Sequence, residues 1–168
     1  MKESAIWRLL VLMARSTGSG AAFFLAAMMM ITIIDVTSRA LFNRPITGAY
    51  DLVQLFLVGS VFLSVPSVFL RGENIVIDFI DHLLGRLAVE VLKVIANLLA
   101  FVFLASLLYQ MVTPAGDAMR FHEVSPDLAI PMGVHWSLML LGIVLALLPA
   151  ALTLANSVVT LVRKLDNR

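Results

Sequence analysis

Four long stretches without a charged residue dominate this sequence and restrict the folds open to it. They cover residues 16–34, 52–70, 94–116 and 128–162. A helix needs about 20 mainly apolar residues to cross a bilayer, and in hydrocarbon it satisfies its own backbone polar groups. The chain is 61% hydrophobic and only 14% charged, whereas a soluble domain has about 25% charged residues. The sequence therefore predicts an all-α integral membrane protein with four transmembrane helices.

Charges and turn residues set the expected limits of these helices. We expect spans at residues 16–41, 49–70, 88–113 and 131–162, within a single membrane domain that covers residues 1–168. The sequence Thr113-Pro-Ala-Gly116 predicts the end of the third span. The fourth apolar stretch is too long for one span at ordinary tilt, so Pro131 is taken as its start and residues 128–130 are expected to lie flat at the interface. Pro149 predicts a kink inside the fourth span.

Two further segments are expected to lie in the membrane interface. Residues 74–86 carry a narrow polar stripe that includes Asp78, on an otherwise apolar helix, and they precede the third span. Alternatively, this segment forms the first turns of one long third helix. Residues 6–13 fit a helix on the membrane surface or a frayed end. No small-residue cleavage site follows the first apolar stretch, which predicts an uncleaved membrane segment.

The distribution of lysine and arginine predicts the orientation, because cytoplasmic loops carry an excess of these residues. With the N-terminus inside, both termini are cytoplasmic and the two short connections face the other side. That arrangement leaves only three basic residues outside: Arg39, Arg44 and Arg120. Nine are then cytoplasmic: Lys2, Arg8, Arg15, Arg71, Arg86, Lys93, Arg163, Lys164 and Arg168.

A short charged connection, residues 35–54, joins the first two spans. Asp35 and Arg39 are four apart, the spacing at which side chains on one helix meet. A turn shaped by Pro45 would bring the helix ends together and place Arg39 between Asp35 and Asp51. Three interpretations are open: the charges close a hairpin, one of them pairs with another subunit, or they form an ion or proton site. The last is the weakest, because transport sites usually lie near the membrane midplane.

Other chemistry finds little support in the sequence. The absence of cysteine excludes disulfides and thiolate metal sites. The three histidines, His82, His122 and His135, share no helix at metal-ligand spacing. No phosphate-binding glycine loop or activated nucleophile is present, so no enzyme is predicted. The spans have too few polar residues for a solute path, which favours an accessory subunit. The alternatives are a membrane anchor of a respiratory enzyme that holds haem through His135 and another histidine, and a stand-alone small transporter or channel.

Three stretches match a known pattern, in the same order along the chain. The matching residues are Asp35, Arg39, Phe42, Asn43, Pro45, Ile46, Gly48, Ala49, Asp51 and Leu52, then Arg71 to Asn74 with Ile75, Ile77 and Asp78, then Ser125, Leu128, Ile130, Pro131 and Gly142. The pattern resembles that of the small membrane subunit, of the DctQ/SiaQ type, of TRAP (tripartite ATP-independent periplasmic) transporters. Two departures occur: Asp51 stands where a glutamate is usual, and Asn74 replaces a common histidine.

The resemblance implies a function and a set of partners. Such a subunit pairs with a large membrane subunit that moves an organic acid and sodium ions by an elevator motion, and a periplasmic binding protein delivers the substrate. The small subunit would brace the large one in a prokaryotic inner membrane, would hold no cofactor, and would leave sodium to its partner. The expected clasp at the subunit interface comprises Asp35, Arg39, Asn43, Pro45, Gly48 and Asp51. Arg71 and Asp78 are assigned to the interfacial helix, and Arg120 and Asp127 to contact with the binding protein.

Overall fold

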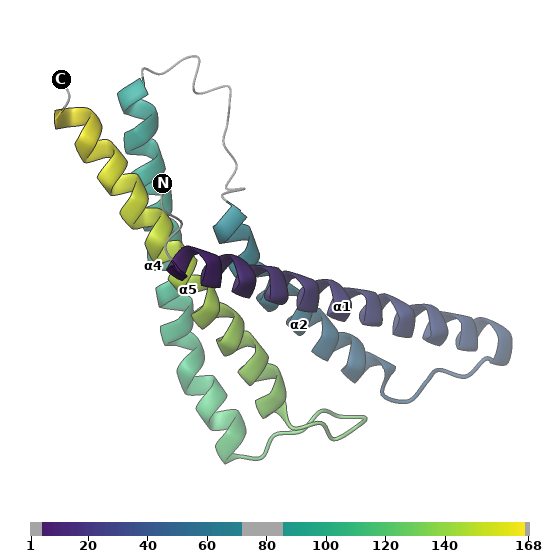
Figure 1. The fold of residues 1–168 in the computed structure, drawn as a ribbon. Helices are drawn as coiled ribbons and strands as arrows, with labels where there is room; N and C mark the ends of the chain where they lie inside the picture. The colour runs from purple at the N-terminus through teal and green to yellow at the C-terminus, as the bar shows by residue number, and fades with distance from the viewer. Residues whose placement is uncertain (1–4, 72–85, 167–168) are drawn as a thin grey trace.

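The computed structural model describes residues 5–71 and 86–166, which form four long helices and their two short connections (Figure 1). The helices are α1 (Ala5–Phe42), α2 (Ala49–Arg71), α4 (Arg86–Arg120) and α5 (Met132–Asp166). Each is long and apolar enough to cross a membrane, over Arg15–Phe42, Ala49–Phe69, Ala88–Arg120 and Met132–Asp166. The predicted all-α architecture with four spanning helices is therefore confirmed.

The helices lie side by side in the order α1, α2, α5, α4. Helix α1 packs along α2, α4 packs along α5, and the two hairpins meet through α2 and α5. In Figure 1 the hairpins splay apart from this contact and form an open V. Within the most apolar stretch of each helix, 28% of the residues of α5 and 22% of those of α2 are buried, against 6% in α1 and α4. The row is thus one helix thick, and most of α1 and α4 faces outward.

The α2–α5 contact depends on a glycine in α5. A Cβ atom at Gly142 would lie 2.6 Å from the carbonyl carbon and 2.8 Å from the Cβ atom of Phe62 in α2. Close backbone approach through a small residue is a common way for membrane helices to pack. Further along, the buried residues Leu104, Ala146 and Ala150 join α4, α5 and α2 in a small apolar core.

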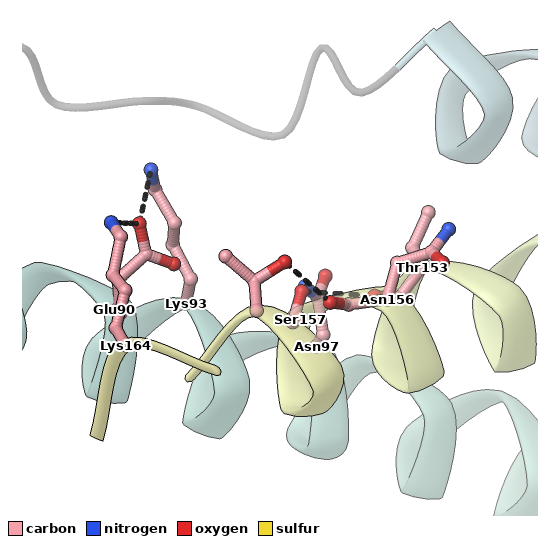
Figure 2. A network of polar contacts seen from close by, with 8 residues as sticks. Glu90, Lys93, Asn97, Thr153, Asn156, Ser157 and Lys164 are labelled. Atoms are coloured by element: carbon pink, nitrogen blue, oxygen red, sulfur yellow. Dashed lines mark hydrogen bonds and ion pairs between the residues drawn. The ribbon is translucent and has the colours of Figure 1, made fainter. Parts of the chain in front are cut away.

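Polar contacts supplement the packing between α4 and α5 toward the ends that carry residues 86 and 166 (Figure 2). Glu90 Oε1 lies 2.6 Å from Lys164 Nζ and 4.0 Å from Lys93 Nζ. About two helical turns further in, Asn97 Nδ2 donates to Ser157 Oγ at 2.8 Å. The Glu90–Lys164 and Asn97–Ser157 contacts thus link α4 to α5.

The third spanning helix is longer than the sequence predicted. The expected end at residues 113–116 is wrong, because α4 continues through Pro114 to Arg120. Ala115 and Ala118 are buried in this extra part of the helix. Packing of these small residues therefore outweighs the helix-ending tendency of Pro114 and Gly116. Hydrogen bonds from Phe121 N to Asp117 O and from Glu123 N to Ala118 O then close the helix end.

The two expected interfacial segments have different outcomes. Residues 5–15 are helical and continuous with the first span, so they form part of α1 rather than a separate helix or a frayed end. The predicted interfacial helix at residues 74–86 falls almost entirely in the range 72–85, outside the described residues, and only Arg86 is seen, as the first residue of α4. Pro149 lies inside α5 and is buried.

Candidate functional site

The α1–α2 turn, residues 43–48, begins and ends with residues in left-handed backbone conformation. Asn43 has a φ of 50° and its N–H donates to the Arg39 carbonyl at 3.0 Å, which closes the end of α1. Gly48 has a φ of 81°, and its carbonyl accepts the first hydrogen bond of α2, from Leu52 N at 3.1 Å. Asparagine and glycine are the residues that adopt this conformation most readily. The sequence therefore determines the shape of the turn locally.

Asp35 ties this turn back onto α1, and we call this arrangement the turn lock. Its Oδ1 accepts a hydrogen bond from Ile46 N at 2.9 Å, and its Oδ2 lies 2.8 Å from Arg39 Nη2. Ser38 Oγ adds a bond to the Arg44 carbonyl at 2.9 Å. Asp35 is largely buried, whereas the Arg39 side chain is 61% exposed. One carboxylate thus fixes the turn and orients an outward-facing guanidinium.

Asp51, in the first turn of α2, holds the second connection in place. Its Oδ2 accepts hydrogen bonds from Ser125 Oγ at 2.6 Å, Asp127 N at 3.0 Å and Leu128 N at 2.8 Å. The Asp51 side chain is completely buried. Hydrogen bonds to an ionised carboxylate are shorter and stronger than those between neutral groups. We call these contacts the loop lock, because they fasten the α4–α5 loop, residues 121–131, to the start of α2.

The α4–α5 loop has an ordered backbone that presents its N–H groups to Asp51. Ser125 N donates to the Ile130 carbonyl at 2.9 Å, and Ile130 N donates to Ser125 Oγ at 3.1 Å. A single antiparallel bridge pairs Val124 with Pro131. Residues 128–130 are part of this closed loop, and their flat position at the membrane interface stays a prediction.

Gly48 is the point where the loop rests on the turn. A Cβ atom at Gly48 would lie 2.7 Å from Leu128 Cδ1. The position therefore excludes a side chain for two reasons, its left-handed backbone and the apolar side chain packed against it. Both connections are thereby joined in one continuous surface, which Figure 1 shows as the α4–α5 loop reaching toward the start of α2.

The structure brings together only some of the residues predicted for the clasp. Arg39 pairs with Asp35 as the spacing predicted, but the expected bridge from Arg39 to Asp51 is wrong. Among the described residues, the partners of Asp51 are the loop groups at Ser125, Asp127 and Leu128. The reason is geometric: Asp35 lies two turns before the end of α1, whereas Asp51 lies beneath the other loop.

The remaining predicted site residues lie at separate places. Arg71 is the last residue of α2, and Asp78 falls outside the described residues. Arg120 ends α4 with its side chain exposed. Asp127 is exposed in the loop and contributes its backbone N–H to the loop lock. Arg120 and Asp127 thus belong to the same connection, on the same side as the turn lock.

Two buried residues beside Asp51 have positions that the sequence analysis did not predict, although it named both. Ser125 is 2% exposed and links Asp51 to the loop backbone, and His135 is 3% exposed in the first turn of α5. Ser125 was part of a family-like stretch, which was the available signal, although nothing in the sequence connects it with Asp51. His122 is exposed in the loop. Within the described residues, no group of three or more histidine, aspartate or glutamate side chains is placed to hold a metal ion.

A comparison with known protein families identifies the chain. The sequence model of the family described as tripartite ATP-independent periplasmic transporters, DctQ component, matches residues 28–160. The chain belongs to the DctQ family. The match covers both locks, from Asp35 to Leu128. It makes this DctQ protein a transporter component with four spanning helices, not an enzyme. Searches of curated proteins and of solved structures gave no significant match.

Proposed function

We propose that this DctQ protein is an accessory subunit that braces the large, sodium-coupled membrane subunit of its transporter during import of an organic acid. A periplasmic binding protein would deliver that substrate. Membership of the DctQ family supports the assignment to a multi-component transporter. The observation that carries the bracing role is the arrangement of the helices in a row one helix thick. Such a row offers broad apolar faces to a partner and encloses no interior.

The side chains on the outer helices fit this role. Large apolar residues are exposed on α1, for example Phe23 at 68%, and on α4, for example Phe103 at 61% and Tyr109 at 83%. In a membrane these faces meet either lipid or another protein. A row of two hairpins presents far more apolar surface than a compact four-helix bundle, so a large partner has ample area to pack against.

The polar groups of the described spans do not support a path for a solute through this subunit. The buried polar side chains are Asp35, Asp51, Ser60, Ser125 and His135. Four of them belong to the connections and the helix ends beside them, and Ser60 Oγ donates to the Leu57 carbonyl of its own helix. A transport site is expected near the midplane, with polar groups facing a cavity. We therefore assign substrate and sodium to the large subunit.

We further propose that both termini lie in the cytoplasm of a prokaryotic cell and that the two locks face the periplasm. Four spanning helices bring the two ends of the chain to the same side. Nine of the twelve lysine and arginine residues are then cytoplasmic, as the positive-inside rule requires. In this orientation the turn and the loop form the surface nearest a periplasmic binding protein.

The proposed clasp is tested by co-purification. Replacing Arg39 by Ala removes the ion pair with Asp35 and is expected to reduce the amount of large subunit that co-purifies with a tagged DctQ protein. Arg44→Ala is the matched control, because only the backbone carbonyl of Arg44 takes part in the turn lock. If Arg39→Ala leaves both co-purification and uptake unchanged, the clasp does not contribute to the subunit interface.

The proposed contact with the binding protein is tested separately. Reversing the charges of Arg120 and Asp127 is expected to raise several-fold the substrate concentration that gives half-maximal uptake in proteoliposomes. The maximal rate should change little, because the pair lies outside the proposed transport pathway. Arg163→Glu, at the opposite end of α5, is the control for a general effect of charge. An unchanged half-maximal concentration in the double variant would assign the contact elsewhere.

A further inference from the structure

Buried polar atoms next to the loop lock have no hydrogen-bond partner among the residues that the structure describes (5–71 and 86–166). They are Asp51 Oδ1 and both ring nitrogens of His135. The two side chains are 0% and 3% exposed. Nearly all buried polar atoms in folded proteins have a partner, and those that lack one within the protein commonly bond to an enclosed water or ion.

The two side chains belong to one site although they come from different helices. Asp51 lies in the first turn of α2 and His135 in the first turn of α5. Helices α2 and α5 pack against each other, and His135 is near enough to Asp51 to interact with its charge, although no direct hydrogen bond joins the two side chains. Ser125, Asp127 and Leu128 occupy the other carboxylate oxygen. Asp51 therefore presents one saturated oxygen to the loop, and its second oxygen lacks a partner.

The chemistry of these atoms matches water better than a cation. A neutral imidazole has one donor and one acceptor, and Asp51 Oδ1 is an acceptor. One water molecule can donate a hydrogen bond to Oδ1 and accept one from the ring N–H of His135. A hard cation would require about six oxygen ligands. The described residues around Asp51 supply one oxygen without a partner and no cluster of acidic or histidine ligands.

We propose that Asp51 Oδ1 and His135 bind one buried water molecule between α2 and α5. The water completes the hydrogen bonding of Asp51 and links the start of α5 to the loop lock. His135 is thereby a positioning residue for the loop, since it acts on the loop backbone through the water and Asp51. This site is independent of the proposed bracing function, because it requires only the fold of this chain.

Nuclear magnetic resonance of the full-length protein in nanodiscs, labelled with ¹⁵N at histidine, tests the water directly. The chain has three histidines, so His82→Gln and His122→Gln variants assign the signals. We expect a cross-relaxation signal between water and the His135 ring N–H whose sign indicates a long-lived, bound water. A fast-exchanging signal, or none, would overturn the proposal. Repeating the measurement with choline in place of sodium should change nothing, and a sodium-dependent change would identify a cation site instead.

Two substitutions test the positioning role. His135→Leu keeps apolar volume but cannot bond to water, and we expect hydrogen exchange at the Asp127 and Leu128 amides to accelerate at least tenfold. His135→Gln retains a donor and an acceptor and should stay within a few-fold of the natural protein. His122→Leu, in an exposed position, is the control. A histidine that only fills space would give the opposite order, with Leu better protected than Gln. If His135→Leu does not fold, the water signal of the unmodified protein still tests whether the proposed water is bound.

Discussion

The contact between the two hairpins depends on the absence of a side chain at Gly142, and this makes Gly142→Ala the sharpest test of the fold. An added Cβ atom would lie 2.6 Å from the carbonyl carbon of Phe62, whereas non-bonded carbon atoms usually approach to about 3.5–4.0 Å. The obstacle is backbone, which cannot rotate away as a side chain can. Helices α2 and α5 must therefore separate locally by about 1 Å to restore normal contact.

The expected cost follows from the overlap. Overpacking of this kind destabilises by about 1–3 kcal/mol, and at about 2–4 °C for each kcal/mol in a chain of this length, the melting temperature should fall by several degrees. Gly116→Ala is the matched control. A Cβ atom there meets nothing within 4 Å, and alanine favours a helix over glycine by about 1 kcal/mol. The control should melt at the same temperature or slightly higher.

The change in geometry can be measured as well as the loss of stability. Because the chain contains no cysteine, cysteines placed at the exposed positions Phe23 in α1 and Leu99 in α4 can carry spin labels without background labelling. Pulsed electron resonance should then report a shifted or broader distance distribution in Gly142→Ala and an unchanged one in Gly116→Ala. Identical melting and identical distances in all three proteins would refute the close α2–α5 contact.

Two further predictions concern the polar contacts. Asp51→Ala removes the acceptor of the loop lock, so the loop should become sensitive to limited proteolysis near Ser125. Asp51→Asn keeps one acceptor oxygen and should be cut more slowly. Equal cleavage rates for both variants would contradict the role assigned to Asp51. Glu90→Gln removes the charge of a pair in which Lys164 is 44% exposed, so it should lower the melting temperature by no more than about 2 °C, in line with exposed ion pairs. The double variant Glu90→Gln, Lys164→Gln separates the ion pair from other effects. If it melts at the same temperature as Glu90→Gln, the loss of stability is due to the ion pair between the two residues.

The helices and the turn lock are predictable because their causes are local. A spanning helix needs only a run of apolar residues, and the sequence has four such runs. Asp35 and Arg39 are neighbours by helix geometry alone. The turn residues Asn43 and Gly48 are those that left-handed backbone favours. These features depend on residues close together in the sequence, so they can be predicted without knowledge of the tertiary structure.

The loop lock and the length of α4 were not predictable because their causes are tertiary. Asp51 and Ser125 are 74 residues apart, and neither residue type specifies a partner at that distance. The same holds for His135, whose environment depends on how α5 lies against α2. Pro114 is a sound signal for a helix end in isolation. It fails here because Ala115 is buried beyond it, and a buried turn is retained despite a lost backbone hydrogen bond.

The two hairpins are held together at several places along α2, among them the loop lock at Asp51 and the close contact at Phe62. Asp51 and Phe62 are eleven residues apart, which corresponds to about 16 Å along the helix axis. With a single point of contact, one hairpin could rotate relative to the other. A second contact, at a distance from the first, restricts the angle between the two hairpins. We therefore expect the angle of the V to be set mainly by the contacts of α2 with α5 and its loop.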